Sequence, residues 1–224
     1  MRQRFTSFRG RVLRLRTGAE APPEGSEGPR RPVLVVGLGN PGAEYGNTRH
    51  NVGAWCVQLL ARRHGARLGR HGKLDGATIE VGGRSLHLAR PRAMMNESGP
   101  PVASELRRLR LRTEQLLVVY DEIDLPVGQL RIRPHGGDGG HRGMRSILGA
   151  VGGNGFARIR IGIDRPYDDG RPVRDPDRIA DWVLSEPGPD ERRQLDEAVA
   201  LAAETIEAAV IEGLDTAMNT FNRR

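Results

Sequence analysis

Three apolar segments of this 224-residue chain lead into a polar residue that is able to take part in chemistry. VLVVG leads into Asn40, LHLAR into Asn96 and LLVVY into Asp121. Short apolar runs of this kind are typical of buried strands. Ligands of open α/β sheets bind outside the carboxyl ends of the strands. If the three strands are parallel neighbours, two amides and a carboxylate therefore converge on one crevice.

His50 follows the first of these strands, near the start of an expected helix, and can face the same crevice. An imidazole beside a carboxylate is the minimum that general-base activation of water requires. The carboxylate of Asp121 would fix the tautomer and stabilise the imidazolium, while the amides would hold a carbonyl or stabilise an oxyanion. No serine or cysteine nucleophile is evident near this set. The pattern therefore favours direct attack by water over a covalent intermediate.

Each of these residues also has a purely structural interpretation. Asp121 can cap a turn, Asn40 can lie in a tight turn before Pro41, and His50 can cap a helix. For any one residue alone, the structural interpretation is the more common. It weakens for the set, because strand ends of one sheet share one edge.

The glycines that follow the first strand match a dinucleotide-binding pattern. Gly37, Gly39 and Gly42 have the spacing G-x-G-x-x-G. However, Pro41 and the residues after Gly42 delay the helix, so that the glycines do not open it directly. No Asp or Glu lies between residues 45 and 74 to bind a ribose hydroxyl. We therefore expect no dinucleotide cofactor, and no cofactor of another kind is indicated.

Residues 131–145 combine glycines with basic side chains and a single acid, Asp138. Such a segment can bind phosphates through its backbone N–H groups and its charge, or it can be a solvated flexible loop. His135 and His141 do not belong to a pattern with metal-ligand spacing. We therefore expect no metal site.

The elements that must position these residues follow from hydrophobic periodicity. Strands and helices alternate along most of the chain, which predicts one α/β domain with a mixed, mainly parallel sheet. The expected strands cover residues 33–39, 116–120, 129–134 and 157–163, with a hairpin over 77–90. The expected helices cover 48–64 (capped by Asn47 or Thr48), 98–109, a stretch from about 144, and 190–212, and the polar residues 164–180 are expected to form a surface loop.

Composition indicates a domain at residues 32–224 that is preceded by a disordered, basic and Pro/Gly-rich extension at residues 1–31. The net charge of +7 is concentrated in that extension, so the total charge alone does not indicate nucleic-acid binding. A single cysteine, Cys56, excludes an internal disulfide framework. No segment has the length and apolarity of a membrane span or a signal peptide. We therefore expect a cytoplasmic protein that does not interact with a membrane.

Five collinear segments, spread over roughly residues 32–222, resemble motifs of the bacterial peptidyl-tRNA hydrolases. Several long motifs in one order make the resemblance far more specific than the glycine pattern. The segments are VVGLGNPGAEYGNTRHNVGAW (35–55), RPRAMMNESGPPV (90–102), VVYDEIDLPVGQLRIRPHGGDGGHRGMRSI (118–147), FARIRIGIDRP (156–166) and AMNTFN (217–222).

The resemblance implies a metal-independent hydrolase that cuts the ester bond between a peptide, or an N-blocked aminoacyl group, and tRNA. It implies that His50 is the base and that Asp121 keeps it in its proton-accepting form. It also implies that Asn40 and Asn96 bind the peptide and the tRNA end, and that Tyr45 contacts the substrate. The fold that it implies is a single three-layer α/β/α sandwich, usually monomeric.

Three positions depart from the motifs of this family. Arg142 replaces an asparagine that binds substrate, Met94 stands where an aromatic residue is common, and Tyr120 stands where a histidine often precedes the aspartate. Arg142 exchanges a short amide for a long cation that only donates hydrogen bonds. It would either bind a terminal phosphate more tightly or block the path of the peptide. The alternative function is therefore a weakly active or inactive RNA-binding relative.

Overall fold

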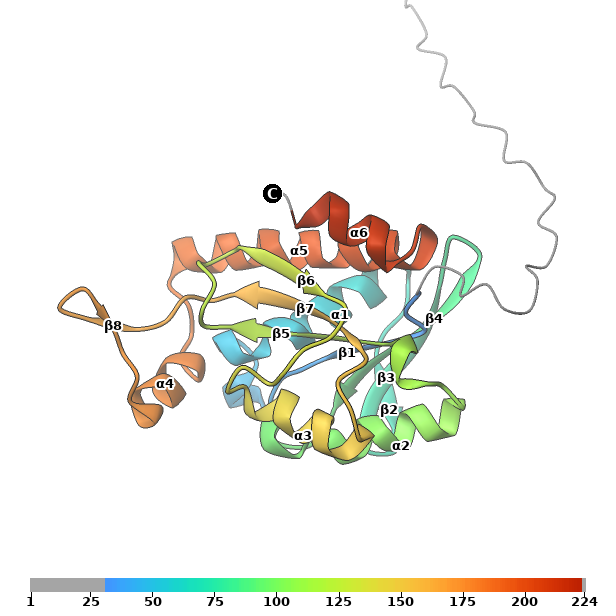
Figure 1. Ribbon diagram of the computed structural model, residues 1–224, viewed down its shortest axis with the longest axis horizontal. Coiled ribbons are helices and arrows are strands. Elements are labelled where there is room, and N and C mark those ends of the chain that lie inside the picture. The colour runs from blue at the N-terminus through green and yellow to red at the C-terminus, as the bar shows by residue number, and fades with distance from the viewer. Residues whose placement is uncertain (1–30, 223–224) are drawn as a thin grey trace, which may run out of the picture.

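The apolar strand segments form the centre of the fold in the computed structural model, which describes residues 31–222 (Figure 1). They build one seven-stranded sheet within those residues, in the order β2-β3-β4-β1-β5-β7-β6. β1 pairs in parallel with β4 and β5, and β5 pairs in parallel with β7, whereas β3 and β6 are antiparallel to their neighbours. The strands are β1 Leu34–Gly37, β2 Gly69–His71, β3 Leu74–Val81, β4 Arg84–Pro91, β5 Leu116–Glu122, β6 Leu130–Arg133 and β7 Ala157–Gly162.

Helices cover both faces of this sheet and give it the three layers of an α/β/α sandwich, as expected (Figure 1). The first layer holds α1 Val52–Arg63, α5 Pro189–Ile211 and α6 Leu214–Phe221, and the opposite layer holds α2 Gly99–Leu109 and α3 Arg142–Val151. A smaller unit beside the sheet consists of α4 Pro176–Val183 and the two short strands β8 Tyr167–Asp168 and β9 Arg171–Pro172. Short 3-10 helices are η1 Ala43–Tyr45, η2 Arg49–Asn51, η3 Met95–Glu97 and η4 Thr113–Gln115.

The central strands are apolar throughout because each of their faces packs against a layer of helices. In β1, Val35 belongs to the core on the α1 and α5 side, whereas Leu34 and Val36 belong to the core on the α2 and α3 side. β5 alternates in the same way, and all seven of its residues are buried. The edge strand β6 has buried Leu130 and Ile132 alternating with more exposed arginines, as its pattern predicts.

Helix α1 approaches the sheet so closely that backbone touches backbone. A Cβ atom on Gly53 would lie 2.2 Å from the carbonyl oxygen of Val119 and 2.7 Å from the backbone nitrogen of Leu38. A Cβ atom on Gly37 would lie 2.1 Å from the carbonyl oxygen of Gly53. These two glycines therefore let the start of α1, and η2 just before it, lie directly over the ends of β1 and β5.

The prediction of a surface loop at residues 164–180 is wrong. The segment contains the β8–β9 pair and most of α4. Asp175 caps α4 by accepting hydrogen bonds from the backbone N–H groups of Asp177 and Arg178, and Pro176 occupies the first turn. Asp followed by Pro is a helix-start signal, but the helix is too short for its periodicity to stand out among the surrounding charged residues.

Other boundaries differ by a few residues. The expected helix 48–64 is divided, because Thr48 precedes η2 and Asn51 is the N-cap of α1. Helix α3 begins at Arg142 rather than near Met144, with the His141 side chain as its cap. β2 and α6 were not expected. The hairpin and the inward face of α5 are confirmed.

The predicted extension at residues 1–31 lies outside the described residues, except for Arg31, so that division of the chain stays a prediction. Among the described residues, no helix is long and apolar enough to cross a membrane.

We expect Gly53→Ala to destabilise the fold by about 3 kcal/mol or more, because the new methyl group would meet backbone atoms that cannot move aside. Gly149→Ala in α3 is the matched control, since a Cβ atom there meets nothing within 4 Å. That control should be stabilised by about 0.5–1 kcal/mol through lower backbone entropy in the unfolded chain. Urea unfolding of both variants measures the difference, and equal stability of the two would refute the close contact.

Candidate active site

The parallel pairing of β1 with β4 and β5 brings the three predicted strand-end residues to one edge of the sheet. They line a cavity of about 450 Å³. Six of the seven predicted site residues lie on its wall, namely Asn40, His50, Met94, Asn96, Asp121 and Arg142. Tyr45 lies in η1 and is not among the lining residues, so its contact with substrate stays a prediction.

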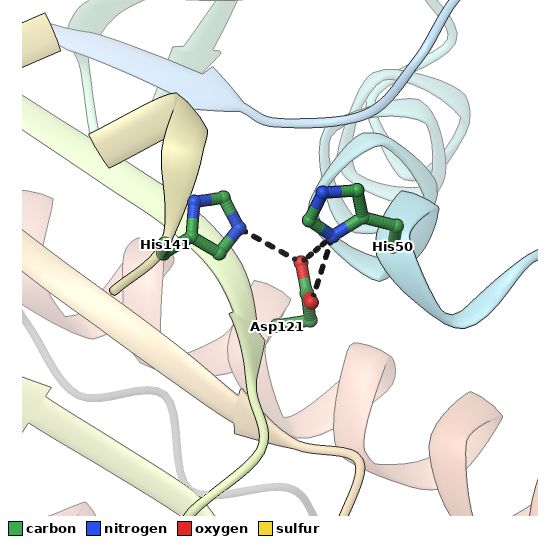
Figure 2. A group of neighbouring side chains, drawn as sticks. All are labelled: His50, Asp121 and His141. Atoms are coloured by element: carbon green, nitrogen blue, oxygen red, sulfur yellow. Dashed lines mark hydrogen bonds and ion pairs between the residues drawn. The ribbon is translucent and has the colours of Figure 1, made fainter. Parts of the chain in front are cut away.

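A buried carboxylate lies between two imidazoles (Figure 2), and all three side chains line this cavity. The Nδ1 atom of His50 lies 2.9 Å from both carboxylate oxygens of Asp121. The Nε2 atom of His141 lies 3.0 Å from Oδ1 of the same carboxylate. Only 2% of the Asp121 side chain is exposed, compared with 11% for His50 and 8% for His141. Asp121 therefore has a histidine on each side and almost no contact with solvent.

The hydrogen bonds around His141 show which of its ring nitrogens carries the hydrogen. The backbone N–H of Met144 donates to Nδ1 of His141 over 3.2 Å. Nδ1 is therefore an acceptor, so the ring hydrogen is on Nε2 and is donated to Asp121. At His50 the partner of Nδ1 is a carboxylate, which can only accept a hydrogen bond. It therefore selects the His50 tautomer with its hydrogen on Nδ1. The Nε2 atom of His50 then carries a free lone pair on the cavity side.

Two neighbouring carboxyl groups have opposite electrostatic environments. Burial opposes ionisation of Asp121, but the charges of His50 and His141 and their hydrogen bonds outweigh it and hold its pKa well below the usual range. Burial raises the pKa of Glu122, and a backbone hydrogen bond from Asp124 and the charge of Arg160 oppose that rise only in part. Asp121 is thus a permanent anion at neutral pH, as a partner for a catalytic imidazole must be.

Asn40 is held from three directions. Its backbone N–H donates to Oδ1 of Asn51 over 2.8 Å, and Nδ2 of Asn51 donates to its carbonyl oxygen over 3.0 Å. The backbone N–H of Met95 donates to Oδ1 of Asn40 over 2.8 Å. This last bond orients the side-chain amide, because an N–H can only donate. The Nδ2 donors of Asn40 are consequently left for a ligand in the cavity.

A buried arginine side chain binds the start of the glycine-rich loop that leads to His141. Arg158 is fully buried, and its Nη1 atom donates to the carbonyl oxygens of Gly136 and Gly137, both over 2.8 Å. Burial lowers the pKa of Arg158. The interpretation of this segment as a solvated flexible loop is therefore too simple, since its start is bound to the central strand β7.

Three side chains at the site have the atoms that metals bind. Ligand atoms of His50, Asp121 and His141 lie within 4.8 Å of one another. Two of these atoms, however, are imidazole nitrogens that face the carboxylate, and the contact with Met144 makes the His141 nitrogen a hydrogen-bond donor. A donor N–H cannot ligate a cation, so this arrangement suits hydrogen bonding better than metal binding.

The rest of the cavity is divided between apolar and cationic side chains. Arg142 and Arg174 line it and form neither a hydrogen bond nor an ion pair with the residues that the structure describes. Met94, 41% exposed, faces the opening. The end of α4 adds an apolar wall formed by Ile179, Ala180, Val183 and Leu184.

Three parts of the site were missed by the expectations from sequence. His141 was considered only as a phosphate or metal ligand and not as a partner of Asp121. Asn51 was overlooked. An asparagine just before an apolar helix is a signal that its side chain forms hydrogen bonds with neighbouring backbone groups. The wall from α4 was missed because its segment was expected to be a loop.

We expect ¹⁵N NMR of the imidazoles near neutral pH to find opposite tautomers for the neutral rings of the two histidines. His50 should carry its hydrogen on Nδ1 and His141 on Nε2, because the first faces Asp121 with Nδ1 and the second with Nε2. Asp121→Asn should remove this preference at His50. The same tautomer at both rings in the unmodified chain would contradict the hydrogen-bond assignment.

Comparisons with known proteins show the family of the chain. The family model described as Peptidyl-tRNA hydrolase matches residues 34–224. A peptidyl-tRNA hydrolase of Alkalilimnicola ehrlichii is 44% identical over 186 residues, which are 81% of this chain and 90% of the relative. One of Mycobacterium tuberculosis is 42% identical over 191 residues, 84% of this chain and 96% of the relative.

Solved structures of peptidyl-tRNA hydrolases also resemble this chain. The crystal structure of peptidyl-tRNA hydrolase from Acinetobacter baumannii has a TM-score of 0.80 and 33% sequence identity, and the alignment covers 88% of this chain and 97% of that one. The family model spans most of the chain, and the relatives align with it over most of their own length. The chain therefore belongs to the peptidyl-tRNA hydrolase family.

Proposed function

We propose that this chain hydrolyses the ester bond between tRNA and a peptide, or an N-blocked aminoacyl group, and releases free tRNA. Membership in the peptidyl-tRNA hydrolase family supports the reaction. The observation that carries the mechanism is the contact of His50 Nδ1 with both oxygens of buried Asp121 at 2.9 Å, in the lining of a cavity. It leaves an imidazole lone pair on a residue that lines the same cavity as Asn40.

In the proposed reaction, Nε2 of His50 removes a proton from a water molecule as the water oxygen attacks the ester carbonyl carbon. The charge of Asp121 stabilises the imidazolium that forms. The Nδ2 donors of Asn40 stabilise the oxyanion, and the imidazolium then returns its proton to the departing 3′ oxygen of the tRNA. No serine, threonine, cysteine or lysine is among the residues that line the cavity, which supports attack by water without a covalent intermediate.

The two kinds of cavity lining suit the two halves of the substrate. The apolar wall of α4, together with Ile123 and Met94, would take the peptide. Arg142 and Arg174, whose charges are unpaired by the described residues, would take phosphates of the acceptor end. Asn96 is exposed and lines the same cavity, where it would be a further ligand, and we keep Tyr45 as an outer contact.

We further propose that the protein acts as a monomer in the cytoplasm. Only four large apolar side chains are exposed among the described residues, namely Met94, Tyr167, Leu184 and Ile211. Two of them line the cavity. No extensive apolar surface therefore calls for a partner subunit.

We expect His50→Ala to lower kcat by about 10²–10⁴-fold with little loss of tRNA affinity, because the variant lacks the general base but keeps the basic surface. The assay is release of tRNA from an N-blocked aminoacyl-tRNA. The matched control is His64→Ala at the far end of α1, where the histidine pairs only with Glu207 near the surface. Unimpaired hydrolysis by His50→Ala would refute the assignment of the base.

We expect Arg142→Asn to weaken tRNA binding and to reduce the slope of log affinity against log salt by about 1, because one phosphate contact is lost. Its kcat should change little. Arg110→Asn is the matched control. Arg110 caps the far end of α2 with a φ of 54°, a conformation that asparagine tolerates.

A rise in kcat on Arg142→Asn would instead mean that Arg142 blocks the peptide path. Salt-sensitive binding by the unmodified chain without any turnover would favour the alternative of an inactive RNA-binding relative. The intact contact between His50 and Asp121 speaks against that alternative.

A further inference from the structure

Arg49 immediately precedes His50 and is buried although it carries a charge. Only 5% of the residue is exposed. A buried guanidinium is stable only when its N–H groups have acceptors and its charge has a partner. The location of those partners shows which parts of the chain Arg49 holds together.

Most of the acceptors belong to one short segment, residues 182–186, which we call the wall segment. Nη1 of Arg49 lies 3.4 Å from the carbonyl oxygen of Trp182, 3.2 Å from those of Ser185 and Glu186, and 2.5 Å from Oγ of Ser185. The backbone N–H of Arg49 donates to the carbonyl oxygen of Ser185 over 3.2 Å. The guanidinium carbon lies 3.8 Å from the centre of the Trp182 ring.

The charge partner comes from a third element. Glu191, in the first turn of α5, accepts from Nε of Arg49 over 2.6 Å and from Nη2 over 2.5 Å. Such a paired, two-bond contact fixes the plane of the guanidinium as well as its position. Arg49 thus ties η2, the wall segment and the start of α5 together.

The wall segment faces the cavity with its other side. Val183 and Leu184 line the cavity, as do Ile179 and Ala180 one turn earlier in α4. The wall is joined to β7 by a long connection that contains β8 and β9, and to α5 by the short segment that follows α4. Val183 also packs in the core, and Trp182 donates to the carbonyl oxygen of Asp164. The contacts of Arg49 are those that join the wall to η2, the element that carries His50.

We propose that Arg49, held by Glu191, is a positioning residue that sets the apolar wall of α4 against His50 and so determines the affinity for apolar side chains in the peptide. This inference rests on the proposed function, because it assigns the peptide to the cavity. Loosening the wall reduces contact with a bulky peptide and leaves a small peptide and the tRNA end unaffected.

The test measures binding, so that it does not depend on turnover. The probes are one tRNA linked at its 3′ end through an amide, in place of the ester, to N-acetyl-dileucine or to N-acetyl-diglycine. Glu191→Gln keeps the shape of the partner and removes its charge, and Arg49→Lys keeps the charge and loses the two-bond geometry. Each should raise the Kd of the dileucine probe about tenfold, the size expected for lost apolar contact in a pocket. The Kd of the diglycine probe should stay within about twofold.

Two further variants complete the design. Arg178→Ala is the matched control, since Arg178 lies on the same helix but forms an exposed ion pair with Asp168 away from the cavity. It should change neither Kd. Leu184→Ala, which shortens a partly exposed wall residue, should give the selective loss with the Arg49 contacts intact. That variant keeps the proposal testable if the Arg49 and Glu191 variants do not fold.

Equal weakening of both probes would overturn the proposal, because it indicates general loss of structure. An unchanged ratio of the two Kd values in folded Glu191→Gln, or in Leu184→Ala, would overturn it as well. Failure of the proposed function has a different signature, since the unmodified chain would then leave the ester-linked forms of both probes intact.

Discussion

The burial of one carboxylate at the end of a central strand is the constraint on which the rest of the site depends. Asp121 is nearly without solvent, and a charge in that position is tolerated only because imidazoles bind it from both sides. His50 comes from the start of a helix and His141 from the end of a loop, so two separate segments must converge on one strand end. The same carboxylate that requires these partners selects the tautomer of each, and the tautomer selected at His50 is the one that the proposed general base needs.

Convergence of this kind requires very close packing. The start of α1 reaches the end of β5 only because Gly37 and Gly53 allow backbone contact between helix and sheet. Asn51 then binds both backbone groups of Asn40, so that the turn after β1 is held to the same helix. The strand ends, the helix start and the amide of Asn40 are therefore held together by direct contacts.

Two buried arginines join irregular segments to these elements. Arg158 binds the carbonyl groups of the glycine-rich loop, and Arg49 binds those of the segment after α4. A guanidinium suits this role because it donates in several directions within one plane, and backbone carbonyls without a helix or sheet partner need donors. The cavity is thus bounded by a loop and a short helix whose positions are set by side chains of the core.

The sequence by itself determined the sheet strands, the long helix α5 and the residues at the ends of β1, β4 and β5, because continuous apolar runs and polar residues after them are local patterns. The motifs shared with the family also identified His50, Asp121 and Arg142 before any geometry was known. Only the tertiary structure decided that His141 shares Asp121 with His50, that Asn51 orients the turn at Asn40, and that α4 forms a wall of the cavity. These features depend on contacts between residues far apart in the chain, and local periodicity carries no information about which distant side chain occupies the space beside a given group.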